Sequence, residues 1–89
     1  MNPKLIAALE LAGFAIHQTG GGCTAWRNES GPDGAYILLT DVDGCSHDIT
    51  DDEVVCIGLY DAEDEPIFYV MGKLRDQVAK QGKLLRDFL

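Results

Sequence analysis

The chain has 89 residues, of which 46% are hydrophobic, and its formal net charge is −8 at pH 7. This is the length of one domain, residues 1–89, and the hydrophobic content is too high for a disordered protein. No apolar run approaches the roughly 18 residues of a membrane span, and the first residues lack the long apolar stretch of a signal peptide. We therefore expect a cytoplasmic protein that has no membrane partner.

The charge is distributed unevenly along the chain. Residues 28–72 contain twelve acidic residues and no Lys or Arg, whereas residues 73–89 contain five basic residues and two acidic ones. An anionic surface repels nucleic acid and acidic membranes, so we expect no direct contact with nucleic acid. A basic protein surface or a divalent cation suits this charge better.

The three cysteines are Cys23, Cys45 and Cys56, and no CxxC pair occurs. An odd number of cysteines without a signal peptide favours free thiols in a reducing cytosol. A zinc site would need four closely spaced Cys or His ligands, which the chain does not offer. We therefore expect no structural metal and no cofactor.

The first predicted element is a helix over about residues 3–13. Asn2 can cap it, Pro3 suits its first position, and Gly13 supplies a stop. The apolar residues between them recur at helical spacing. Residues 14–16 then lead into a short strand or an extended turn.

The middle of the chain alternates between β-favouring runs and turn residues. A tight type I′ turn is predicted at residues 41–44, because Asp-Gly favours that geometry. Consecutive strands joined by short turns are antiparallel. The predicted strands cover residues 23–29, 35–40, 45–49, 54–60 and 66–71.

A second helix is predicted from residue 73 onwards, after Gly72, with Gly82 interrupting it. Leu74, Val78 and the apolar residues that follow mark its buried stripe. The fold class is therefore α+β: a four- to five-stranded antiparallel sheet with an N-terminal and a C-terminal helix packed on one face, in the order α-β-β-β-β-α.

The two strands at residues 35–40 and 54–60 are almost continuously apolar, which indicates burial on both faces. Two helices can cover only one face of the sheet, so the other face should expose an apolar patch that serves as an interface. We expect a homodimer formed sheet to sheet, or a hydrophobic face for a partner. The predicted interface residues are Trp26, Tyr36, Leu38, Val55, Ile57 and Leu59.

Cys45 and His47 form the one reactive-looking pair, since both would project from the same face of a strand. A thiol-dependent enzyme built on them is an alternative function. No third group is placed to orient the histidine, and the nearby carboxylates would raise the pKa of the thiol. We therefore expect no enzymatic activity and no catalytic residues.

Asp41 and Asp43 precede Gly44 in a way that resembles the start of a calcium loop. The full pattern needs a glycine at its sixth position and a glutamate at its twelfth. The glycine arrives too early here, and Asp52 stands where the glutamate should be. A plain turn is favoured over a metal site, and weak divalent-cation binding is the alternative.

The acidic residues gather at turns between the predicted strands, where they would be held at fixed intervals. Such a surface favours a protein-interaction module that binds a basic surface of a partner, such as a nucleic-acid-binding surface. The alternative is a small structural or dimeric domain whose acidity serves solubility alone. The predicted partner-binding residues are Asp41, Asp43, Asp48, Asp51, Asp52, Asp61, Glu63, Asp64 and Glu65.

Two segments, residues 19–26 (TGGGCTAW) and residues 40–44 (TDVDG), resemble small proteins found in bacteriophages and prophage regions. The resemblance implies a small accessory protein in a bacterial or viral cytosolic setting. It implies no catalytic residues.

Overall fold

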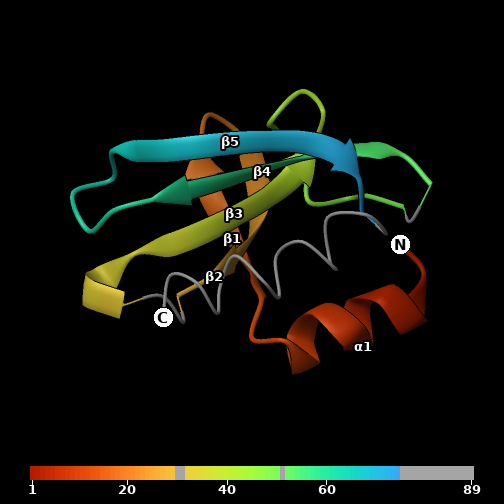
Figure 1. Cartoon of the computed structure of the whole chain (residues 1–89). Helices are drawn as coiled ribbons and strands as arrows, with labels where there is room; N and C mark the ends of the chain where they lie inside the picture. The colour runs from red at the N-terminus through yellow and green to blue at the C-terminus, as the bar shows by residue number, and fades with distance from the viewer. Residues whose placement is uncertain (30–31, 51, 75–89) are drawn as a thin grey trace.

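The computed structural model describes residues 1–29, 32–50 and 52–74. In this part of the chain, five antiparallel strands form one sheet in the order β1-β2-β3-β4-β5, so that each strand lies beside the next one in sequence (Figure 1). The elements are α1 (Pro3–Leu11), β1 (Ala15–Gly20), β2 (Cys23–Asn28), the 3-10 turn η1 (Pro32–Gly34), β3 (Tyr36–Asp41), β4 (Val54–Tyr60) and β5 (Pro66–Lys73).

Helix α1 begins at Pro3, as predicted, and ends at Leu11, two residues before the predicted end. The Asn2 side chain accepts a hydrogen bond from the backbone N–H of Lys4 at 2.8 Å, which caps the first turn. Gly13 has a φ of 98°, a conformation that glycine adopts without steric cost, and the backbone N–H of Phe14 returns to the carbonyl of Leu9 at 2.9 Å. This closure turns the chain directly into β1.

The predicted α+β arrangement with two helices is wrong for the part of the chain that the structure describes, which is mostly sheet with the single helix α1. Strand β5 runs on through Gly72 to Lys73, because Val55 and Val54 extend β4 far enough to pair with both residues. Gly72 therefore belongs to the sheet. The remainder of the predicted second helix, residues 75–89, lies outside the described residues.

The predicted strand at residues 45–49 is also wrong, since this segment is part of a long loop between β3 and β4. The carboxylate of Asp41 accepts hydrogen bonds from the backbone N–H groups of Cys45 at 3.0 Å and Ser46 at 3.2 Å. The Cys45 carbonyl accepts from the backbone N–H of Thr24 at 2.8 Å. These local partners satisfy the backbone groups that a strand would have paired in a ladder.

The turn at residues 41–44 lies where it was predicted but has a different type. The backbone N–H of Gly44 donates to the Asp41 carbonyl at 3.0 Å, and Gly44 has a φ of 73°. Val42 and Asp43 do not have the positive φ values that a type I′ turn requires. The positive φ therefore falls on Gly44, the last residue of the turn, and not on its two central residues.

One side of the sheet, which we call the core face, packs against α1, below the sheet in Figure 1. The register places Trp26 opposite Leu39 and Leu39 opposite Ile57, so these side chains share that face. The buried core consists of Leu9, Phe14, Trp26, Ile37, Leu39, Ile49, Val55, Ile57, Leu59 and Leu74.

Four of the six residues predicted for an exposed interface are therefore buried in the core: Trp26, Val55, Ile57 and Leu59. Their exposed fractions lie between 0% and 7%, so they cannot form the predicted patch. The register places the other two, Tyr36 and Leu38, on the opposite side of the sheet, where Tyr36 is also buried, at 6% exposed. We call that side the open face, because α1, the helix of the described residues, does not cover it (Figure 1).

Candidate functional site

A continuous row of polar and aromatic side chains crosses the open face, with one member from each strand. We call it the cross-strand row, and it consists of His17, Arg27, Tyr36, Tyr60 and Tyr69. Nη1 of Arg27 lies 3.5 Å from Nε2 of His17, and Cζ of Arg27 lies 3.9 Å from the centroid of the Tyr36 ring. The rings of Tyr36 and Tyr60 stack with centroids 5.1 Å apart, and Tyr60 meets Tyr69 edge to face at 5.9 Å.

The sheet register explains why these side chains meet. Tyr36 pairs directly with Tyr60, and Tyr69 pairs with Gly58, two residues before Tyr60 on the same face. A Cβ atom at Gly58 would lie 2.8 Å from Cε2 of Tyr60 and 3.1 Å from Cδ1 of Tyr69, so both rings lie directly over the glycine. A glycine inside a strand is typical of such a close approach.

Tyr36 and Tyr60 stay protonated far above neutral pH. Burial, and then the hydrogen bond from its hydroxyl to Oδ1 of Asp64 at 2.8 Å, raise the pKa of Tyr36 to about 12. Burial is also the first cause that raises the pKa of Tyr60, followed by its hydrogen bond with the Tyr69 hydroxyl at 3.3 Å. The stacked rings of Tyr36 and Tyr60 are therefore neutral phenols.

The row carries a positive charge at Arg27, and this charge is already paired. Nε of Arg27 lies 2.7 Å from Oε1 of Glu29. A pocket of about 260 Å³ opens at this end of the row, lined by Gly13, Ala15, Ile16, His17, Arg27 and Glu29. Because its guanidinium is engaged by Glu29 and by the Tyr36 ring, Arg27 is poorly placed to hold an additional anion there.

The other end of the row is exposed. Tyr69 and Met71, both on the open face of β5, are each 57% exposed. Val54, on the same face of β4, is 44% exposed. Exposed aromatic and apolar side chains that adjoin one another are typical of a binding surface.

An acidic turn, residues 61–65, adjoins this face between β4 and β5. Oδ1 of Asp61 accepts the backbone N–H groups of Glu63 at 2.9 Å and Glu65 at 3.0 Å, so the turn is held by its own carboxylate. Asp64 has a φ of 64° and accepts the Tyr36 hydroxyl, which ties the turn to the row. The side chains of Glu63 and Glu65 remain exposed.

The turn between β2 and β3 packs against the acidic turn. A Cβ atom at Gly34, where φ is 82°, would lie 2.9 Å from Cβ of Ala62. This close contact brings the exposed Asp33 to the same end of the sheet as residues 61–65.

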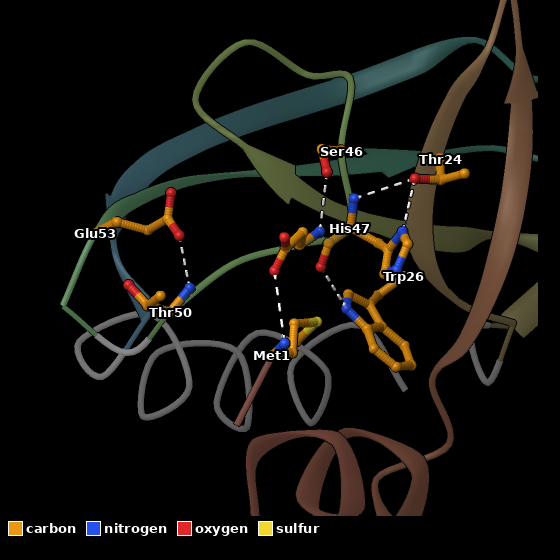
Figure 2. A network of polar contacts seen from close by, with 8 residues as sticks. Met1, Thr24, Trp26, Ser46, His47, Thr50 and Glu53 are labelled. Carbon is orange, nitrogen blue, oxygen red and sulfur yellow. Dashed lines mark hydrogen bonds and ion pairs between the residues drawn. The ribbon is translucent and has the colours of Figure 1, made fainter. Parts of the chain in front are cut away.

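The other described acidic residues predicted to bind a partner lie at the end of β3 or in the loop between β3 and β4, at the opposite end of β4. Asp41 holds the turn there, and Asp48 lies 3.8 Å from the N-terminal amino group of Met1 (Figure 2). Asp43 and Asp52 are exposed, whereas Asp51 lies outside the described residues. The structure thus divides the predicted acidic surface into two groups.

Cys45 and His47 do not form the predicted reactive pair. Cys45 is joined to Cys23 by a disulfide, with their Cα atoms 4.5 Å apart, so the prediction of free thiols is wrong for these two residues, and Cys56 is free. Nδ1 of His47 shares a hydrogen bond of 2.7 Å with the hydroxyl of Thr24 (Figure 2). A sulfur bound in a disulfide offers no thiolate to act as a nucleophile.

The backbone of His47 has a structural role. Its carbonyl accepts a hydrogen bond from Nε1 of Trp26 at 2.9 Å, and its N–H donates to the hydroxyl of Thr24 at 3.2 Å (Figure 2). The disulfide and these bonds fasten the loop to β2. In the described residues, no group of three His, Cys, Asp or Glu side chains is placed to hold a metal ion.

Sequence reasoning missed most of the cross-strand row. Of its members, only Tyr36 was among the predicted site residues, as part of an apolar patch. A signal is present in Tyr36, Tyr60 and Tyr69, but it can be recognised only with the register, which brings residues up to 33 positions apart onto three consecutive strands of the sheet.

No helix in the described part of the chain is long and apolar enough to cross a membrane. The chain matches no family model, no curated protein and no solved structure. The resemblance to phage and prophage proteins therefore stays a prediction.

Proposed function

We propose that the chain is a small protein-interaction module that binds a basic, extended segment of a partner protein on its open face. The observation that carries the proposal is the placement of an exposed strip, Tyr69 and Met71, on the strand that follows an acidic turn. The hydrogen bond from Tyr36 to Asp64 ties that turn to the row. A basic segment would find apolar contact and opposite charge on one surface.

The two parts of the surface have different roles in this proposal. Burial of Tyr69 and Met71 under a partner removes apolar area from water, which supplies affinity. Carboxylates at the rim, such as Glu63 and Glu65, steer a basic segment toward the face and disfavour acidic partners. Binding should therefore weaken as salt is added, without being abolished.

The rigidity of the acidic turn distinguishes this surface from a merely soluble one. The carboxylate of Asp61 binds the backbone of the turn, and that of Asp64 binds the hydroxyl of Tyr36. The backbone that carries the exposed Glu63 and Glu65 is therefore held in place, unlike that of a mobile tail. A domain whose acidity served solubility alone would gain nothing from this fixation.

The compartment is a related proposal. A cytoplasmic setting was expected because the sequence shows no signal peptide and carries an odd number of cysteines. The bond between Cys23 and Cys45 favours an oxidising setting, since disulfides persist there and are reduced in the cytosol.

The test uses a fluorescently labelled basic peptide as long as β5, eight residues, in which Lys or Arg alternates with apolar residues. Fluorescence anisotropy would measure its affinity at low and at high salt. We expect binding that weakens with salt and that falls several-fold in Glu63→Lys. The matched control is Asp43→Lys, an exposed acidic residue in the loop at the other end of β4, which should have a much smaller effect.

Equal losses in Glu63→Lys and Asp43→Lys would show that only net charge matters, and the acidity would then serve solubility. Equally tight binding of an acidic peptide of the same length would also contradict the proposal, because no charge complementarity would be involved.

A further inference from the structure

The protein already shows how its open face holds a guanidinium group. Cζ of Arg27 lies 3.9 Å above the centroid of the Tyr36 ring, while its Nε meets Oε1 of Glu29 at 2.7 Å. One arginine thus contacts an aromatic ring and a carboxylate at the same time. Arginine suits this arrangement because its guanidinium is planar and weakly hydrated, whereas the lysine ammonium is a compact, strongly hydrated charge.

Tyr69 repeats the aromatic half of that arrangement at the exposed end of the row. Its ring stands at 83° to the ring of Tyr60, so the two are not stacked, and the residue is 57% exposed. In the described part of the chain, Arg27 is the cation that lies over a tyrosine of the row, and it lies over Tyr36. Among the described side chains, no cation lies over the ring of Tyr69, which is therefore open to one from a partner.

Carboxylates that could bind a second basic side chain lie on the acidic turn that precedes β5. Tyr69 lies four residues after Glu65 along the strand, which corresponds to roughly 13 Å at the usual rise of a β-strand. An extended segment of about five residues covers that distance. A basic side chain at one end of such a segment would reach the turn while another residue lay on Tyr69.

We infer that the occupant of the open face is an arginine-bearing extended segment of a partner protein, whose guanidinium lies on Tyr69 as that of Arg27 lies on Tyr36. The inference rests on the proposed function and specifies its ligand. Charge decides against a nucleic acid, since the chain carries −8 and the adjoining turn is acidic.

The test compares two labelled peptides that are identical except that every arginine of the first is a lysine in the second. Anisotropy at low salt should show the arginine peptide binding on the order of fivefold more tightly, the size of a partly desolvated cation–π contact. Tyr69→Leu should remove this preference and leave the lysine peptide's affinity nearly unchanged. Tyr69→Phe, which keeps the ring, should retain the preference.

The control variant is Val42→Ser, which changes an exposed apolar residue in the loop between β3 and β4 and should alter neither affinity. A circular-dichroism spectrum of each variant checks that the fold is kept. Sedimentation without peptide shows whether a second copy of the chain already covers the face, in which case the inferred occupant is wrong.

The possible failures differ. If neither peptide binds, the proposed function fails and the inference falls with it. If both bind equally tightly, the module binds basic segments without distinguishing arginine from lysine, and only the inference is overturned. A preference that survives in Tyr69→Leu would also overturn it, because arginine would then be recognised elsewhere.

Discussion

Removing the disulfide between Cys23 and Cys45 should lower the free energy of unfolding by roughly 3 kcal/mol. The two cysteines are 22 residues apart in sequence, and closing a loop of that length in the unfolded chain removes about 11 cal/mol/K of entropy. A chain of 89 residues is typically stable by about 4–13 kcal/mol. The bond thus accounts for a large share of the stability.

The structure indicates why the loss should remain near the entropic value. The backbone bond from Thr24 to Cys45 and the bonds from Thr24 and Trp26 to His47 do not involve sulfur. They can hold the loop against β2 in the folded state after the disulfide has gone. Most of the effect should therefore lie in the unfolded chain, which becomes free to explore more conformations.

Urea denaturation of the double variant Cys23→Ser/Cys45→Ser, compared with the unaltered protein, measures the loss. A reductant should lower the midpoint of the unaltered protein and leave that of the double variant in place. Cys56→Ala is the control, because Cys56 is the free cysteine and its removal should not change the response to reductant. Equal midpoints, or three thiols that react with an alkylating agent without prior reduction, would refute the reasoning.

Three further predictions concern the packing around the row and the loop. Gly58→Ala places a Cβ atom 2.8 Å from Cε2 of Tyr60, so we expect a loss of about 1–3 kcal/mol in urea denaturation, and an unchanged midpoint would contradict the close approach. Burial and a carboxylate hydrogen bond raise the pKa of Tyr36 to about 12 from 10.0, so the folded state holds this proton more tightly than the unfolded state. Stability from this source is complete below pH 10 and falls as the pH rises toward 12; an ultraviolet titration should show fewer tyrosinates in folded than in unfolded protein at the start of this range. Trp26→Phe removes the donor to the His47 carbonyl and leaves a gap in the core, which should cost roughly 2 kcal/mol or more by thermal or urea denaturation, whereas a loss near zero would mean that the bond contributes little.

The elements that could be predicted are those whose signals are local. Asn2, Pro3 and Gly13 fix the ends of α1 because each acts through the backbone of its own turn. Strand β4 has the bounds expected from its apolar run, residues 54–60. Such signals need no information from elsewhere in the chain.

The errors arise where a partner far away in sequence decides the structure. The glycine at Gly72 indicated a break, but Val55 on β4 lies opposite and extends the ladder past it. Residues 45–49 follow an Asp-Gly turn, from which a strand was expected to fold back, yet the carboxylate of Asp41 binds the first of their N–H groups and the segment remains a loop. Composition alone cannot show which backbone groups will find a partner.

The burial of both faces of β3 was indicated by its apolar run, but the assignment of residues to faces was not. Leu39 and Leu38 are neighbours, and the register sends the first to the core beside Ile57 and the second to the open face beside Gly58. A shift of one residue would exchange them. The row from His17 to Tyr69 depends on four such registers at once, so the sequence could not reveal it.

The acidic residues show how a count of charges can mislead about a binding surface. Asp41 and Asp61 each accept two backbone N–H groups within a turn, and Asp64 accepts the hydroxyl of Tyr36. Reversing Asp61 or Asp64 to lysine would therefore disrupt the turn and the row together, and a loss of binding could not be assigned to charge. Glu63 is exposed and its side chain holds no part of the turn, so charge reversal there alters the surface while the scaffold beneath it stays intact.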